Sequence, residues 1–258
     1  MLRKMILIAA AALLCAPSSA KAAFGFGLNE QEVQEIVKDY IYNNPQVIID
    51  SLKRMQVLEE QNRQRQARAR VEQHRELLER DPATPVMGNP DGDVIIVEFF
   101  DYNCGYCKLM YKKVSEAVEK DGNMRWVLKD LPMLAESSET AALAGLAANE
   151  QGKYTEMHRE LMNVQGGLDA KKINAAAKKI GLNMKKFEAD MKKPEFKEHL
   201  QQNRQLAQEL EIQGIPQFII GEYVSQGAMM GDELEAAAQA VRFKNKATGE
   251  SAAPALAQ

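Results

Sequence analysis

The fold of this chain is decided by Phe99-Phe100-Asp101-Tyr102-Asn103-Cys104-Gly105-Tyr106-Cys107-Lys108. The β-branched run 94–97 just before it predicts a strand, and a helix is expected just after it. Cys104 therefore lies at a predicted helix N-terminus, where free N–H groups and the helix dipole favour a thiolate over a thiol. Because a thiolate is the species that attacks disulfides, the stretch predicts redox chemistry at Cys104 and Cys107.

Two other interpretations of the cysteine pair are weaker. A structural bridge between Cys104 and Cys107 would close a very short loop, which stabilises a fold poorly. A zinc site would need two further ligands, but the sequence has no second cysteine pair, and its histidines lack ligand spacing: His74, His158 and His199.

Residues 1–22 have the pattern of an export signal. Arg3 and Lys4 precede an apolar stretch, and Ala20-Lys21-Ala22 has the small-x-small form of a cleavage site. The third cysteine, Cys15, lies in this segment. We expect cleavage after Ala22, export to the periplasm, and a mature protein whose thiols are Cys104 and Cys107.

Charge and hydropathy exclude some classes of function. The chain has 258 residues and a net charge of −3, so nucleic acid is an unexpected partner. No stretch after residue 22 is apolar enough to cross a membrane, and we expect a soluble protein after cleavage.

An appendage is expected at residues 23–58. Asn29 with Glu32 predicts a capping box, and Asn44-Pro45 separates two short helices whose apolar residues recur at helical spacing. The segment 59–82 is rich in Glu, Gln and Arg and predicts a polar helical linker. The apolar stripe could fold back on the main domain or pair with another subunit. The polar linker favours the second alternative, a homo-oligomer formed through residues 28–58.

The main domain is predicted to begin near residue 83. Strands are expected at 94–97, 124–128 and 215–220, with a tight turn at Gly221-Glu222 into Tyr223-Val224. Helices are expected within 141–148, 154–164, 170–180, 184–191, 196–212 and 232–243. The tail 246–258 is small and polar enough to be disordered.

This order of elements, the cysteine pair and Gly214-Ile215-Pro216 together resemble the DsbA-like family of exported thiol:disulfide oxidoreductases. The resemblance covers residues 83–245 and implies an α/β thioredoxin fold with an inserted α-helical subdomain at about 135–212. It also implies a cis Pro216 that faces the cysteines, so that Ile215 and Pro216 line the site where a client backbone docks. From the residues alone, a trans proline at the start of an edge strand is the ordinary alternative.

Glu98 interrupts an apolar strand six residues before Cys104, where family members carry a buried acid. A buried carboxyl group has a raised pKa and could relay the proton of Cys107. Lys129, on the neighbouring predicted strand, is its expected ion-pair partner. The alternative is a Glu98 that faces an edge and has no partner.

Gly105 and Tyr106 separate the cysteines, where strongly oxidising family members have proline and histidine. Without the positive charge of a histidine, this chain should be a weaker oxidant. Cys-Gly-Tyr-Cys is also the motif of DsbC, an exported isomerase. DsbC and ScsC-like members oligomerise through N-terminal segments, although many of them have threonine where this chain has Ile215.

The sequence therefore predicts an oligomeric, exported disulfide isomerase or reductase that acts through its own Cys104–Cys107 pair, with no other cofactor and no metal. The resemblance implies clients with disulfides and a membrane reductase of the DsbD or ScsB type. The first alternative is a dithiol oxidase served by a DsbB-like partner. The second is a chaperone or interaction protein that binds through a Met-rich surface, although methionines are more often core residues: Met110, Met133, Met229 and Met230.

Overall fold

A computed structural model describes residues 27, 29–225 and 227–249 of the protein. The predicted export signal at 1–22 lies outside the described residues. The described residues fall into two compact units, which divide between Val57 and Leu58. The predicted appendage at 23–58 and the first unit therefore end within one residue of each other.

The first unit contains α1 (Glu30–Asn43) and the first part of α2 (Gln46–Gln73). The predicted capping box is present, since Asn29 Oδ1 accepts from the Glu32 N–H and Glu32 Oε2 accepts from the Asn29 N–H. Asn44 ends α1, as predicted. The apolar stripe of this unit is exposed: Val33, Ile36, Val37, Tyr40, Ile41, Val47, Ile48, Leu52 and Met55.

The second unit is built on a mixed sheet of five strands in the order β1-β3-β2-β4-β5. Its central strand β2 (Val94–Phe100) pairs in parallel with β3 (Met124–Asp130) and antiparallel with β4 (Gln217–Ile220). β4 turns at Gly221, which has a φ of 58°, into β5 (Tyr223–Val224), as predicted. β1 (Val86–Gly88) forms the opposite edge.

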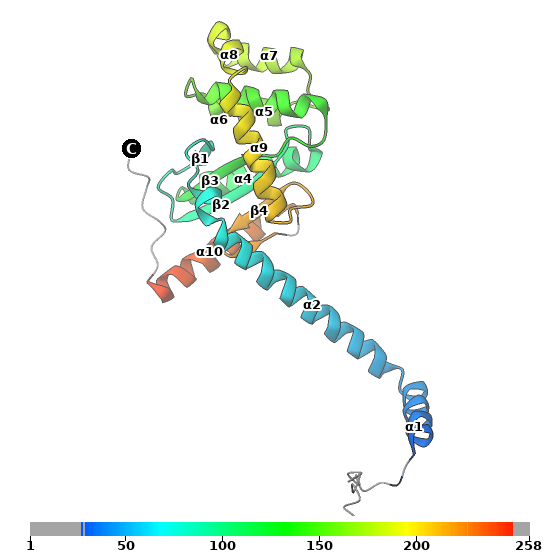
Figure 1. Ribbon diagram of the computed structural model, residues 1–258. Coiled ribbons are helices and arrows are strands. Elements are labelled where there is room, and N and C mark those ends of the chain that lie inside the picture. Colours follow the sequence, from blue (N-terminus) through cyan, green and yellow to red (C-terminus); the bar gives the residue numbers. More distant parts are fainter. Residues whose placement is uncertain (1–26, 28, 226, 250–258) are drawn as a thin grey trace, which may run out of the picture. The chain divides into compact units, whose positions relative to one another are not determined.

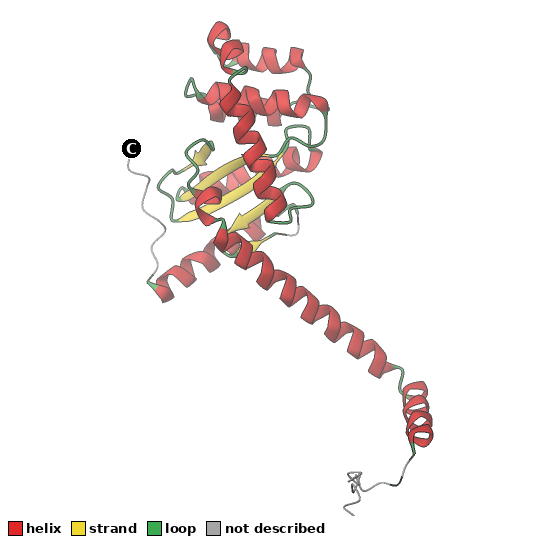
Figure 2. Cartoon of the chain, viewed as in Figure 1, coloured by secondary structure: helices red, strands yellow, loops and turns green. Residues whose placement is uncertain are grey.

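Each face of the sheet has its own core. The cysteines, α4 (Gly105–Asp121) and α10 (Gly231–Thr248) pack on the face that carries Ile96 and Phe100. The end of α2, α3 (Arg75–Glu79) and α9 (Pro194–Glu209) cover the face that carries Val97 and Phe99. Figures 1 and 2 show the sheet between these helical layers. Because side chains alternate along a strand, successive residues of β2 point to opposite faces of the sheet and belong to different cores.

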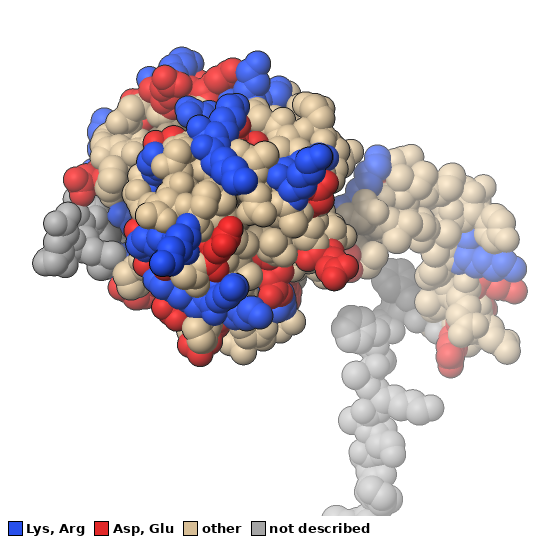
Figure 3. Space-filling model, turned by 90° about the horizontal axis from the view of Figure 1, so that it is seen from above, with Lys and Arg blue, Asp and Glu red and all other residues tan. Residues whose placement is uncertain are grey.

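A helical subdomain is inserted between β3 and β4, as expected from the resemblance. It comprises α5 (Glu136–Asn149), α6 (Tyr154–Met162), α7 (Ala170–Lys179) and α8 (Met184–Asp190), and α9 returns from it to the sheet (Figure 1). The surface viewed from the side of α7 and α8 carries basic and acidic side chains intermixed (Figure 3). No helix within the described residues is both long and apolar enough to cross a bilayer.

The first strand and the last helix of the second unit differ from the sequence expectations. Strand β1 was not expected, because a segment of three residues that ends in a glycine shows no strand periodicity. The pairing of Val86 with Val127 in the sheet identifies it. Helix α10 continues to Thr248, so the first residues of the predicted disordered tail are helical, and residues 250–258 lie outside the described residues.

Candidate active site

Cys104 is the N-cap residue of α4, at the carboxyl end of the central strand. The N–H of Cys107 donates to Cys104 Sγ at 3.1 Å, and the Cys104 thiol lies 3.7 Å from the carbonyl oxygen of Ile215. The pKa of Cys104 is lowered to about 7, chiefly by the hydrogen bond from the Cys107 thiol and further by the N–H groups of Cys107 and Tyr106. A large fraction of Cys104 is therefore thiolate at neutral pH.

Cys107 is fully buried one helical turn further along. Burial raises the pKa of its thiol well above the ordinary value, and the neighbouring Cys104 and Glu98 raise it further. The two thiols thus differ strongly in acidity within one motif. Cys104 is suited to be the attacking nucleophile, and Cys107 needs a proton acceptor before it can attack.

Glu98 is 1% exposed and lies on the cysteine face of the sheet. The indole N–H of Trp126 donates to Glu98 Oε2 at 3.0 Å, while Oε1 has no partner among the described residues. Burial raises the pKa of this carboxyl group to about 8, against the opposing effect of the Trp126 hydrogen bond. A group that changes charge near neutral pH, close to a thiol with a raised pKa, has the properties of a proton relay.

The expected ion pair between Glu98 and Lys129 is wrong. Lys129 lies opposite Phe99 in the β2–β3 register, whereas Glu98 lies opposite Leu128, so the two side chains point to opposite faces of the sheet. The Lys129 ammonium instead donates to Asp81 Oδ2 at 2.9 Å and to Thr84 Oγ1 at 2.6 Å. Lys129 therefore anchors the segment before β1 to the sheet.

The Ile215–Pro216 peptide bond is cis, as the resemblance implied. Pro216 is buried and Ile215 half-buried, and the Ile215 carbonyl faces Cys104. Of the two residues between the cysteines, Tyr106 is 69% exposed. A Cβ at position 105 would meet nothing within 4 Å, so space does not require Gly105. The structure brings Ile215 together with Cys104, and Tyr106 stands at the surface.

Asp101 and Asn103, which were not singled out from the sequence, fix the loop that carries Cys104. Asp101 is 2% exposed, and its carboxylate accepts from the N–H groups of Asn103, Met133 and Leu134 at 2.8–3.0 Å. The Asn103 amide donates to the hydroxyls of Ser137 and Ser138 and accepts from the Leu168 N–H. An acid and an amide directly before the cysteine pair were the available signal, but their partners are distant in sequence.

Lys108 and His158 were also missed as parts of the site. The Lys108 ammonium donates to the carbonyl oxygens of Val164 and Gly166, each at 2.8 Å, and so joins α4 to the helical subdomain. His158 is fully buried among aromatic rings, and its Nδ1 lies 3.0 Å from the Tyr102 hydroxyl. Burial lowers the pKa of His158 to about 3, so this ring is neutral.

The four methionines of the expected Met-rich surface divide into two pairs. Met110 and Met229 are each 3% exposed and belong to the core, as the ordinary interpretation expects. Met133 and Met230 are 54% and 46% exposed. A continuous methionine surface formed by all four residues is therefore excluded.

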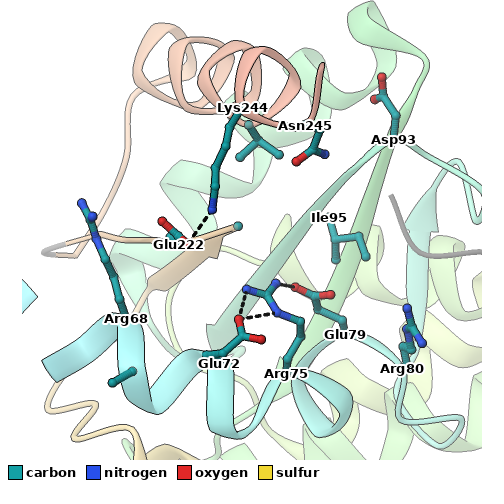
Figure 4. A pocket seen from close by; sticks show the side chains of 13 residues that line it. Arg68, Glu72, Arg75, Glu79, Arg80, Asp93, Ile95, Glu222, Lys244 and Asn245 are labelled. Atoms are coloured by element: carbon teal, nitrogen blue, oxygen red, sulfur yellow. Dashed lines mark hydrogen bonds and ion pairs between the residues drawn. The ribbon is translucent and has the colours of Figure 1, made fainter. Parts of the chain in front are cut away.

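A separate cleft of about 640 Å³ lies at the amino end of β2, away from the cysteines (Figure 4). Arg75 there pairs with Glu72 and Glu79, and Lys244 pairs with Glu222. These two cations are therefore neutralised by neighbouring carboxylates.

Comparison with known proteins agrees with this site. A profile of the thioredoxin family matches residues 80–240. A thioredoxin-like oxidoreductase from Silicibacter pomeroyi is 39% identical, with a TM-score of 0.64 over 66% of this chain and 98% of that one. The catalytic domain of Proteus mirabilis ScsC is 29% identical, with a TM-score of 0.61 over 67% and 97%. The thiol-disulfide exchange protein α-DsbA2 from Wolbachia pipientis is 26% identical, with a TM-score of 0.66 over 70% and 98%.

The chain belongs to the thioredoxin family. Within it, the relatives and the site place the chain with the DsbA-like and ScsC thiol-disulfide oxidoreductases. Among curated proteins, the Na(+)/H(+) antiporter NhaA 1 of Salinispora arenicola is 35% identical over 85 residues. That match covers 32% of this chain and 13% of the antiporter, so the chain spans a small part of that relative.

Proposed function

We propose that this protein is an exported, oligomeric oxidoreductase that isomerises or reduces disulfides of client proteins. The observation that carries the proposal is the hydrogen bond from the Cys107 N–H to Cys104 Sγ at 3.1 Å, at the N-terminus of a 17-residue helix. This contact favours the thiolate at Cys104, beside a cis Pro216 and a buried Cys107.

The reaction begins with attack of the Cys104 thiolate on a client disulfide. One sulfur of the client bonds to Cys104, and the other leaves as a thiolate. In isomerisation, a client thiolate, either the one just released or one freed by its attack on a second client disulfide, then attacks the mixed disulfide, and Cys104 leaves as a thiolate with no net transfer of electrons. In reduction, the Cys107 thiolate attacks Cys104 Sγ, so that the client gains two electrons and Cys104–Cys107 becomes a disulfide. A proton leaves Cys107 in that step, and Glu98 is its proposed acceptor.

Gly105 and Tyr106 favour an isomerase or reductase over a strong oxidase. Neither residue adds positive charge beside Cys104, and the strength of a dithiol oxidant depends on how well its thiolate is stabilised. A protein of this kind must be kept reduced, and we propose a membrane thiol reductase of the DsbD or ScsB type as its source of electrons. A dithiol oxidase served by a DsbB-like protein uses the same two cysteines and is the second candidate.

Self-association through residues 28–58 is part of the proposal. The stripe on α1 and the start of α2 is exposed in this chain, with Tyr40 at 57% and Ile36 at 55%. Contiguous apolar surface of this kind marks an interaction site. An oligomer would hold several Cys104 sites around one misfolded client.

The redox state of Cys104 and Cys107 in the cell tests the direction of the reaction. Thiols are trapped with acid and then alkylated with a mass tag. A mostly reduced pair is expected, whereas a mostly oxidised pair would indicate the oxidase. Cys104→Ser should abolish activity on disulfides, whereas protection of unfolded clients that survives Cys104→Ser unchanged, with no disulfide activity in the wild type, would indicate a chaperone.

Deletion of residues 23–58 tests the role of the appendage. The shortened protein should be a monomer that still reduces insulin but no longer refolds a scrambled multi-disulfide protein. Retention of both the oligomer and the isomerase activity would contradict this part of the proposal.

A further inference from the structure

A groove of about 400 Å³ lies between the last turns of α2 and the loop before β4. One wall consists of Gln64, Ala67 and Arg70, which follow one another at a spacing of three residues along α2. All three are half-buried, whereas their neighbours Arg65 and Gln66 are exposed. The helix thus presents one defined face to the groove, and this part of α2 belongs to the same compact unit as the cysteines.

The opposite wall reaches the active site. It is formed by residues 210–215, and Ile215 is shared with the site, because its carbonyl oxygen lies 3.7 Å from Cys104 Sγ. In a mixed disulfide the Cα atoms of the two cysteines are about 4.4–6.8 Å apart, so a client chain bonded to Cys104 must pass close to Ile215. The client residues that flank the bonded client cysteine on one side therefore lie next to the groove.

The lining of the groove suits a polypeptide backbone rather than one kind of side chain. Gln64 and Gln213 contribute side-chain amides and Gly214 exposes backbone, while the Gln217 amide and the Ser225 hydroxyl are engaged in hydrogen bonds within the loop. Several of these groups are already held in place. The Gln217 amide donates to the carbonyl and the hydroxyl oxygen of Ser225. Fixed polar groups lower the entropic cost of binding, and backbone recognition tolerates many client sequences.

Arg70 is held in the same way. Its guanidinium pairs with Glu211 at 2.9 Å, across the groove from α2 to the loop that follows α9. This ion pair and the burial of Val71 in the sheet core keep this stretch of α2 in place beside the loop. The helical wall is therefore a fixed part of the second unit.

We propose that α2 is part of the client-binding site: its face at Gln64, Ala67 and Arg70 holds the extended client segment next to the cysteine that is bonded to Cys104. This inference rests on the proposed function and adds a binding surface to it. Small disulfides do not reach the groove, but unfolded polypeptides do. The helix that carries the apolar stripe would then also select the substrate class.

Filling the groove tests the proposal. Ala67→Trp in the full chain places a large side chain in the groove, and Gln66→Trp adds the same bulk on an exposed position of the same helix. Ala67→Trp should leave the rate of reduction of oxidised glutathione unchanged and slow reduction of a scrambled protein by about fivefold or more, a loss of about 1 kcal/mol. Gln66→Trp should match the wild type with both substrates.

A second measurement avoids any change in the groove. In Cys107→Ser protein, Cys104 is bonded either to a cysteine-containing peptide of unfolded character or to glutathione, and hydrogen exchange of residues 60–73 is followed. The peptide should slow exchange in this part of α2, and glutathione should not. The proposal that the groove binds the client would be overturned by equal exchange in the two mixed disulfides, or by equal rates for Ala67→Trp and the wild type. The proposed function would remain intact in either case. A wild type that reacts with neither disulfide would overturn both.

Discussion

The carboxyl group of Glu98 and the indole of Trp126 share one hydrogen bond of 3.0 Å across the two parallel strands at the centre of the sheet. One hydrogen bond does not compensate a fully buried carboxylate for its lost hydration, so burial raises the pKa of Glu98 to about 8. The buried thiol of Cys107 lies on the same face of the sheet. The acid next to the cysteine pair is therefore neutral at pH 7 and ready to change charge just above it.

Replacement of Glu98 by glutamine should slow the step that Cys107 performs. Release of a client peptide from Cys104 should be about tenfold to hundredfold slower, since general base catalysis is lost. In the wild type the pH profile of this rate should have an inflection near 8, where Glu98 ionises, and the variant should lack that inflection. Stopped-flow measurement of peptide release from pH 6 to 9 tests this. Glu79→Gln, a change of another buried acid, is the control, and equal pH profiles for Glu98→Gln and the wild type would refute the relay.

Stability should respond to Glu98 as well. The folded pKa of about 8 lies above the unfolded value of 4.5, so the unfolded chain ionises first as the pH rises. The contribution of the neutral carboxyl group to folding is complete below pH 4.5 and is lost between that pH and about 8, at about 1.4 kcal/mol per pKa unit as an upper bound. Urea unfolding of the reduced protein should show Glu98→Gln gaining stability over the wild type from pH 5 to pH 8. A constant difference would contradict the raised pKa.

Tyr106→His tests how the residues between the cysteines set the acidity of Cys104. A histidinium beside the helix N-terminus adds to the groups that stabilise the thiolate, so the pKa of Cys104 should fall below about 7 and the protein should become more oxidising. The ultraviolet absorbance of the thiolate and equilibrium with glutathione measure the two effects. Tyr106→Phe keeps the ring without the charge and should resemble the wild type. An unchanged Cys104 pKa in Tyr106→His would show that this position does not tune the thiol.

The features that could be predicted from the sequence are those set by residues close together in the chain. The helix start at Cys104, the capping box of Asn29 and Glu32, and the turn at Gly221 each follow from residues close together in the chain. The partner of Lys129 could not be predicted in this way. It depends on which face of the sheet the Lys129 side chain points to, and a shift of one residue in the strand register moves a side chain to the opposite face. The hydrogen bonds of Asp101 to Met133 and Leu134 likewise span more than 30 residues and exist only once β2 and β3 are paired.

The ion pair of Lys129 and Asp81 provides a stability test of that corrected contact. Lys129 is 1% exposed, and Asp81→Asn would leave its ammonium buried without a full counter-charge, at a cost of about 3–5 kcal/mol. Lys129→Met combined with Asp81→Asn removes both charges and should recover much of that loss. Urea unfolding of both variants and of Lys129→Met alone measures the coupling. Additive effects of the two single changes would show that the pair is not coupled.

Replacement of Asp101 should lower the stability of the fold and make the Cys104 thiol more acidic. Asp101→Asn keeps one acceptor oxygen but turns an amide donor towards backbone N–H groups, so the variant should lose about 1–3 kcal/mol of stability. The same change removes a negative charge that raises the pKa of Cys104, and the thiol should become more acidic.

Urea unfolding and thiolate absorbance separate these two effects. Asp121→Asn is the control, because it breaks an ion pair with Arg242 at the other end of α4, about 25 Å away along the helix. That variant should lose stability without a change in the pKa of Cys104. If Asp101→Asn also leaves the pKa of Cys104 unchanged, Asp101 holds the loop in place but does not influence the charge of the nucleophile.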